Sequence, residues 1–178
     1  DAESLRDAML AASGELDRRI GGESFRQPIA GEALEGLSMK GGAYTPSPSA
    51  DCLRRSLYMF SKRGLIVPMM TTFDQCDTTM PTGRRDVSIV PTQALTLLNN
   101  AWVGERADAC AASVLMNASG REQRVELAWQ QALGRMPTPA ERSAAVAHVE
   151  EMAGGDEQAA WASLCLVLFN TNEFVFVD

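Results

Sequence analysis

The sequence contains a single histidine, His148, and four cysteines that form no Cys-x-x-Cys pair. Structural zinc sites usually draw on closely spaced cysteines and histidines, so the spacing predicts no zinc site. A Ser-His-Asp or Cys-His arrangement would have to use His148, which borders the apolar face of its predicted helix and is expected to be structural. We therefore expect no metal site, no cofactor and no catalytic group of these kinds in this chain.

The sequence also lacks long apolar runs and a surplus of positive charge. Its longest nearly apolar stretch, Trp161–Phe169, is far shorter than the roughly 20 residues that cross a bilayer. The net charge is -7, whereas binding to nucleic acid requires a broad basic face. No glycine-rich phosphate loop is present. We expect neither a membrane span nor a nucleic-acid partner.

The remaining composition is that of an ordinary globular domain. The chain has 178 residues, of which 46% are hydrophobic and 22% charged, enough for one domain with a substantial core. Cys110 and Cys165 lie in apolar helical patterns and are expected to pack as small hydrophobic residues. Cys52 and Cys76 flank a basic segment, and whether they form a disulfide stays open.

Apolar periodicity predicts a mainly α fold, a single domain over 1–178 with about five to six helices. The predicted helices cover 2–20, 92–99, 101–117, 121–133, 138 to about 153, and about 156 to 168. Gly21-Gly22 is expected to end the first helix, and Gly134 the fourth. Residues 138–141 (Thr-Pro-Ala-Glu) have the pattern of a capping box, in which the threonine and the glutamate bind each other's backbone.

The region between the first two helices has no clear period. Repeated glycine and proline predict a long loop over 23–51, with Tyr44 anchoring its far end, and a second loop over 74–91. Residues 55–61 are expected to form one short extended stretch. Side chains of an extended stretch alternate between two faces, so Arg55 would share a face with Leu57 and Met59.

This irregular centre also holds the chain's positive charge. Residues 54–85 contain six cations and two carboxylates in an otherwise acidic chain. The cations are Arg54, Arg55, Lys62, Arg63, Arg84 and Arg85. Arginine binds carboxylate, sulfate or phosphate through two parallel hydrogen bonds, so these residues are candidates for an anion site.

The favoured alternative is that these cations pair within the protein. Asp74, Asp77 and Glu173 are the predicted partners, because a buried arginine needs a compensating charge. The same three carboxylates could instead supply a general acid and base. A pair of carboxylates is an unspecific signal, however, and this hypothesis is the weaker one.

Several segments together resemble one known family. They are RDAMLAASGELD (6–17), RRSLYMFSKR (54–63), TTFDQCDTTMPTGRRDVSIVPTQALTLLNN (71–100), ALGRMPTPAE (132–141) and LFNTNEFVFVD (168–178). The chain is similar to a planctomycete secreted domain of unknown function, found at the C-terminal end of large proteins that often carry a cytochrome-c-like domain. The resemblance implies a C-terminal fragment of a larger protein, located outside the inner membrane (secreted, periplasmic or on the cell surface). Any haem would lie elsewhere, because Cys-x-x-Cys-His is absent here.

Three functional hypotheses follow. The first is a non-catalytic structural or interaction domain that contacts other domains of the same polypeptide, with a variant in which the arginines bind an anionic ligand such as a sulfated polysaccharide. The second is an extracellular hydrolase of carbohydrates or esters that uses Asp74, Asp77 or Glu173. The third is a docking surface for the cytochrome-c-like domain. The sequence favours the first, because it shows well-marked helix ends and no catalytic constellation.

Overall fold

The computed structural model describes residues 1–29, 44–62, 66–76 and 81–176. Two of the predicted site residues, Arg63 and Asp77, lie outside these ranges, as does much of the predicted loop at 23–51. The described residues are mainly helical, and their only β pairing consists of isolated bridges. The predicted fold class is therefore confirmed.

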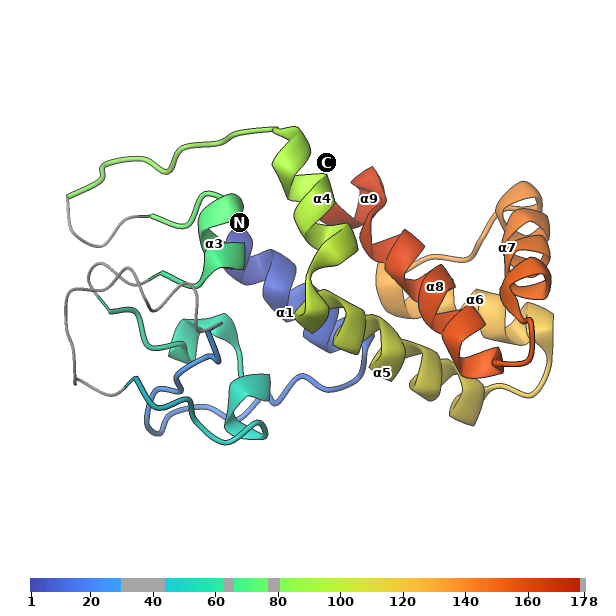
Figure 1. The fold of residues 1–178 in the computed structure, drawn as a ribbon, viewed down its shortest axis with the longest axis horizontal. Coiled ribbons are helices and arrows are strands. Elements are labelled where there is room, and N and C mark those ends of the chain that lie inside the picture. The colour runs from blue at the N-terminus through green and yellow to red at the C-terminus, as the bar shows by residue number, and fades with distance from the viewer. Residues whose placement is uncertain (30–43, 63–65, 77–80, 177–178) are drawn as a thin grey trace. The chain divides into compact units, whose positions relative to one another are not determined.

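Figure 1 shows the helices along the chain. They are α1 (Ala2–Ala12), the 3-10 helices η1 (Asp51–Leu53) and η2 (Ser56–Tyr58), α3 (Pro68–Thr72), α4 (Pro91–Asn99), α5 (Ala101–Asn117), α6 (Arg121–Leu133), α7 (Pro139–Met152), α8 (Glu157–Phe169) and α9 (Asn172–Val175). The short helices α3 and α9 were not predicted, because five and four residues are too few to show a helical period.

The described chain divides into two compact units. The first contains Asp1–Asp7 and Leu16–Gln93, and the second contains Ala8–Glu15 and Ala94–Asp178. Helices α1 and α4 each contribute residues to both units. The expectation that residues 1–178 form a single domain stays a prediction.

The second unit is a bundle in which α5, α6, α7 and α8 pack on one another. Helices α6 and α8 are both central to this packing, since each contacts the other three helices as well as α9. The largest fully buried side chain of the unit is Trp161 of α8. Phe169 and Phe174 pack with their ring centroids 4.9 Å apart and so attach α9 to the end of α8. Burial of such rings is the main source of stability for the unit.

The helix ends of the second unit follow the sequence signals closely. Thr138 and Glu141 form the predicted capping box at the start of α7, with Pro139 in the first turn. Gly134 ends α6 with φ of 68°, a left-handed conformation that only glycine adopts without strain. The predicted bounds of α5 and α6 match the structure.

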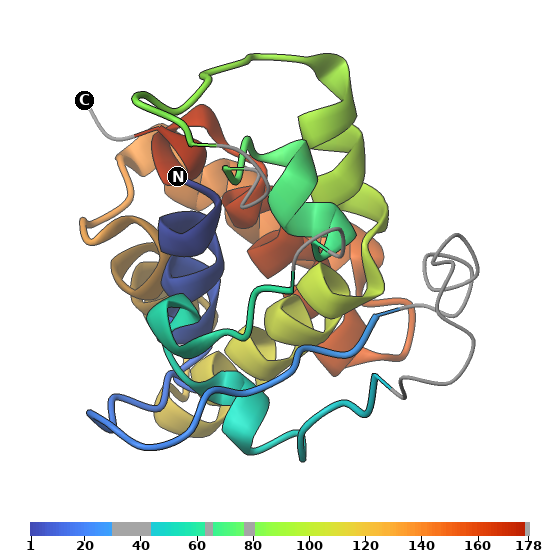
Figure 2. The same ribbon diagram turned by 90° about the vertical axis from the view of Figure 1, so that its left-hand side faces the viewer.

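The first unit depends on loops instead of helix packing. Residues 16–29 and 44–60 lie side by side (Figures 1 and 2), joined by bridges between Asp17 and Arg54 and between Phe25 and Met59. The hydroxyl of Tyr44 donates to the carbonyl of Gln27 at 2.6 Å, which confirms the anchoring role predicted for that ring.

The first helix is shorter than predicted. Helix α1 ends at Ala12, and Gly14 follows with φ of 77°. The Glu15 amide then bonds back to the carbonyl of Leu10 at 2.9 Å, which closes the helix. The apolar period continued to residue 20, but Asp17 pairs with the backbone of Leu53 in the neighbouring loop instead.

The prediction of an extended stretch at 55–61 is wrong for residues 56–58. Ser56–Tyr58 form a 3-10 turn, in which the Met59 amide bonds to the Ser56 carbonyl. The cause is a long-range contact: the Asp7 carboxylate accepts from both the amide and the hydroxyl of Ser56, at 2.8 and 2.7 Å. As a result Leu57 is 77% exposed, and the predicted alternation of faces does not occur.

A pair of glycine substitutions tests the account of the helix ends. Gly134→Ala should lower the free energy of unfolding by about 1 kcal/mol, because alanine is strained at positive φ. Gly104→Ala, inside α5, should raise it by about 0.5–1 kcal/mol, since alanine favours the helix. At both positions an added Cβ would meet no neighbour within 4 Å. Steric clashes therefore do not contribute to the difference between the two variants. Urea unfolding measures both, and equal effects of the two changes would contradict the assignment.

Candidate functional site

The structure disperses the predicted basic residues. Arg54 is buried, Arg55, Lys62 and Arg85 are half-buried, and Arg84 is exposed. Arg54 and Arg55 both lie over the ring of Tyr58, whereas Arg85 pairs with Glu3. The predicted anion site therefore has to be assessed residue by residue.

Arg54 binds backbone carbonyls of the neighbouring loop. Its two terminal nitrogens donate to the carbonyls of Glu23, at 2.6 Å, and of Gly21. The guanidinium lies over the ring of Tyr58, 4.1 Å from the centroid. The Tyr58 hydroxyl in turn accepts from the Gly21 amide at 2.8 Å. Arg54 thus closes a turn at 21–23, and its charge is balanced by carbonyl dipoles and a ring face.

The most buried arginine of the first unit, Arg6, was not among the predicted site residues. It is 2% exposed, and its guanidinium donates to the carbonyls of Arg54 (3.0 Å) and Cys52 and to the side chains of Ser56 and Gln27 (both 3.2 Å). The neighbouring Asp7 carboxylate lies 3.5 Å away. In the sequence, Arg6 looks like an ordinary residue of a polar helix face, and only the loops that fold over it make it internal.

Arg85 pairs with Glu3. Its two terminal nitrogens reach the two carboxylate oxygens at 2.6 and 2.7 Å, the bidentate geometry that arginine favours. This hydrogen-bonded pairing lowers the pKa of Glu3 from its usual value. The sequence pattern gave no signal for this partner, which lies 82 positions away along the chain.

Asp74 holds Ser88, not an arginine. Its carboxylate accepts from the Ser88 amide at 2.7 Å and from the Ser88 hydroxyl at 2.9 Å. Among the described residues Asp74 is the only one other than glycine with positive φ, at 58°. Gln93 completes the arrangement, since its amide nitrogen donates to the carbonyls of Thr72 (3.1 Å) and Ser88 (3.2 Å). We call Asp74, Ser88 and Gln93 the latch.

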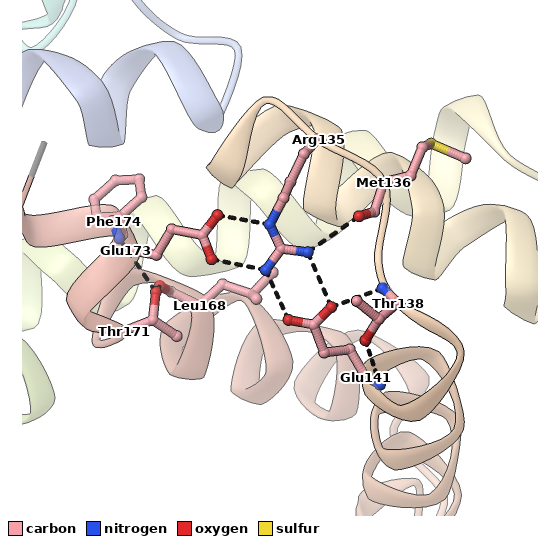
Figure 3. Close-up of polar contacts among 8 residues, drawn as sticks. All are labelled: Arg135, Met136, Thr138, Glu141, Leu168, Thr171, Glu173 and Phe174. Carbon is pink, nitrogen blue, oxygen red and sulfur yellow. Dashed lines mark hydrogen bonds and ion pairs between the residues drawn. The ribbon is translucent and has the colours of Figure 1, made fainter. Parts of the chain in front are cut away.

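Glu173 pairs with Arg135 of the second unit, as Figure 3 shows. Arg135 follows Gly134 and lies between two carboxylates, Glu173 and Glu141. It donates to Glu173 at 2.6 and 2.7 Å and to Glu141 at 2.7 and 2.9 Å, and a fifth bond goes to the Met136 carbonyl at 3.0 Å. All five guanidinium protons are therefore used. The cluster links the turn after α6 to the starts of α7 and α9, a structural role that leaves no donor for a ligand.

The first unit has a groove of about 540 Å³ beside Arg54. Its wall consists of residues 19–25, 47–48, 51 and 54. Arg19 on this wall is paired with Asp17 and Asp51, at 2.5 and 3.4 Å. The groove therefore presents paired charges of both signs, which makes it a poor match for an anion.

No catalytic constellation is visible in the part of the chain that the structure describes. The carboxylates Asp74 and Glu173 are engaged by Ser88 and Arg135. His148 contacts Ser163 at 3.0 Å between α7 and α8. The described residues include no group of three or more potential metal ligands. Nor does any described helix combine the length and apolar character that a bilayer-spanning helix requires.

The geometry thus defines a helical domain whose arginines mainly bind its own backbone and carboxylates. The chain belongs to the PSD1 family, proteins of unknown function (DUF1553), whose family model matches residues 1–149. No curated protein and no solved structure matches the chain. The resemblance seen in the sequence is therefore confirmed at the level of a domain of unknown function.

Substitution of Arg6 should destabilise the first unit. Arg6→Lys keeps the charge but cannot satisfy four acceptors spread over two loops, so the free energy of unfolding should fall by about 3 kcal/mol. Hydrogen exchange should accelerate at 21–27 and 52–58. Arg18→Lys is the control, because Arg18 is exposed. Unchanged protection in the Arg6 variant would show that the loops do not depend on this guanidinium.

The Arg135 cluster predicts a specific pH dependence. Arg135 lowers the pKa of Glu141 and of Glu173 from the usual value of 4.5, so the folded state favours their ionised forms. The stabilisation is fully present above about pH 4.5 and is lost as the pH falls through the lowered values. Arg135→Gln should therefore be less stable than the wild type at pH 7, with a difference that shrinks towards pH 3. Urea unfolding across this range measures it. A constant difference would contradict the assignment, and Arg84→Gln should follow the wild-type curve.

Proposed function

We propose that this chain is a non-catalytic structural and interaction domain that binds a neighbouring domain of the same secreted polypeptide. The observation that carries the proposal is an exposed apolar segment, Val87–Val90, that polar side chains hold in place. The engaged state of the arginines and carboxylates supports the same conclusion, because it leaves little free chemistry for a ligand or a reaction.

The segment exposes apolar side chains to an unusual degree. Val87 is 84% exposed, Ile89 78% and Val90 41%. Single exposed apolar residues are common on protein surfaces, but several in succession indicate a contact surface. Burial of each such side chain by a partner would contribute about 1.5–3 kcal/mol.

The latch holds the exposed segment in one conformation. Ser88, between the two most exposed residues, is bound through its amide, hydroxyl and carbonyl by Asp74 and Gln93. Gln93 is itself buried, and Asp74 adopts a backbone conformation that is uncommon for residues other than glycine. A segment fixed in advance loses less conformational entropy when a partner binds, so the latch favours docking.

The partner follows from the charges and from the family resemblance. Arg84, just before the segment, is exposed and has no ion pair within the described part of the chain. It would suit a carboxylate on the partner surface. A neighbouring domain of the same polypeptide is the expected partner, because the resemblance places this domain at the end of larger proteins. Whether that neighbour is the cytochrome-c-like domain stays a prediction. Binding of a sulfated polysaccharide also stays a prediction, for which the candidate residues are Arg54, Arg55, Lys62, Arg63, Arg84 and Arg85.

A double substitution tests the proposal. Val87→Asp with Ile89→Asp should weaken binding between this chain and the remainder of its polypeptide, produced separately, by at least about tenfold, because charges replace buried apolar groups. Calorimetric titration measures the affinity. Met116→Asp is the control, since Met116 is equally exposed but lies on α5, far from the segment in sequence.

Two results would overturn the proposal. One is the absence of any binding between the two wild-type pieces. The other is an equal loss of affinity in the double variant and in the Met116 control, which would assign the effect to added negative charge and not to the segment.

A further inference from the structure

The backbone of the exposed segment 87–90 is hydrogen-bonded along one edge. Ser88 and Val90 have both their amides and their carbonyls bonded within the first unit. The Ser88 amide donates to Asp74 at 2.7 Å, and the Ser88 carbonyl accepts from the Gln93 side chain at 3.2 Å. The Val90 amide donates to the Gln93 side chain at 3.4 Å, and the Val90 carbonyl accepts from the Gln93 amide at 3.0 Å. Asp74 and Gln93 therefore take the place of a neighbouring strand along this edge.

The alternate residues Val87 and Ile89 leave the opposite edge free. Within the described part of the chain, neither their amides nor their carbonyls form a hydrogen bond. The segment belongs to no helix or turn, none of its residues has positive φ, and it runs as an extended ribbon into α4 (Figure 1). In an extended chain the amide and carbonyl of one residue point to one edge, and those of the next residue point to the other. Val87 and Ile89 therefore present unpaired donors and acceptors, as an edge strand does.

The side chains of the segment agree with this description. Val87 and Ile89 are 84% and 78% exposed, whereas Ser88 between them is half-buried. Valine and isoleucine are among the residues that favour β-strands. Proteins usually protect an exposed edge strand with charged side chains, proline or a bulge, because such an edge pairs readily with another strand. Residues 87–90 contain neither a charge nor a proline, so this edge is open to pairing.

We propose that the segment receives an extended strand of the neighbouring domain, which pairs with the backbone of Val87 and Ile89 by β-augmentation. The inference rests on the proposed docking function and specifies the element that docks. The incoming strand has apolar side chains at alternate positions, because these cover Val87 and Ile89 across the pair. A carboxylate at one of its ends meets Arg84, which is exposed and has no ion pair among the described residues.

A matched pair of substitutions separates backbone pairing from side-chain contact. Ile89→Pro removes the amide and keeps most of the apolar side chain, whereas Ile89→Ala keeps the amide and removes most of the side chain. If a strand pairs here, the proline variant should bind the remainder of the polypeptide, produced separately, at least about tenfold more weakly than the alanine variant. Docking through side chains alone gives the opposite order. Calorimetric titration measures both affinities.

Amide hydrogen exchange, followed by NMR, provides a second readout on the wild-type chain. In the free chain the amides of Val87 and Ile89 should exchange fast and that of Ser88 slowly, because Asp74 already binds the Ser88 amide. In the complex, exchange at Val87 and Ile89 should slow at least about tenfold. Proline is compatible with an extended residue before it, so slow exchange at Ser88 in the Ile89→Pro variant shows that the latch is intact.

Each of the following results overturns the inference. If the wild-type pieces bind but the proline variant binds as tightly as the alanine variant, or the two amides stay unprotected, docking uses side chains alone and the proposed function stands without strand pairing. If the free chain dimerises in analytical ultracentrifugation and protects the same two amides, the edge receives a second copy of this chain. If the wild-type pieces do not bind at all, the proposed function fails and the inference fails with it.

Discussion

The first unit depends on one buried cation. Arg6 lies on a helix that two loops cover, and its guanidinium supplies the donors that the loop carbonyls and side chains would otherwise lack. A buried charge without such partners would strongly destabilise the fold. The requirement therefore works in both directions: the loops need the donors, and the arginine needs the acceptors. Arg54 is a second buried arginine of this unit, and it donates in the same way to the carbonyls of Gly21 and Glu23.

The second unit is stabilised in a different way. There the apolar faces of α5 to α8 bury tryptophan, phenylalanine and small residues, and charges act mainly at helix ends. Arg135 is the clearest case, because its five bonds bring together three chain segments at the surface of the bundle. Such an exposed cluster contributes geometry more than free energy, since solvent screens its charges.

In both units, most of the described arginines that have partners bind groups of the fold itself. Arginines that complete the fold cannot at the same time bind an incoming anion with full strength. Val87 and Ile89, on the segment that Asp74 and Gln93 hold at Ser88, are among the most exposed large apolar side chains of the first unit, together with Ile20 and Leu57. In the proposed docking function, the hydrogen bonds at Ser88 hold the apolar side chains beside it in place for a partner.

The sequence by itself determined the helical class, the bounds of α5 and α6, the capping box at Thr138 and the end of α6 at Gly134. These features depend on residues within a few positions of one another, so a local pattern contains the information. It could not show that Arg6 is the internal cation, that Glu173 meets Arg135, or that Asp7 bends Ser56 out of an extended conformation. Only the tertiary structure decided these, because each depends on groups brought together from distant parts of the chain, where the pairing that satisfies burial and hydrogen bonding leaves no periodic trace.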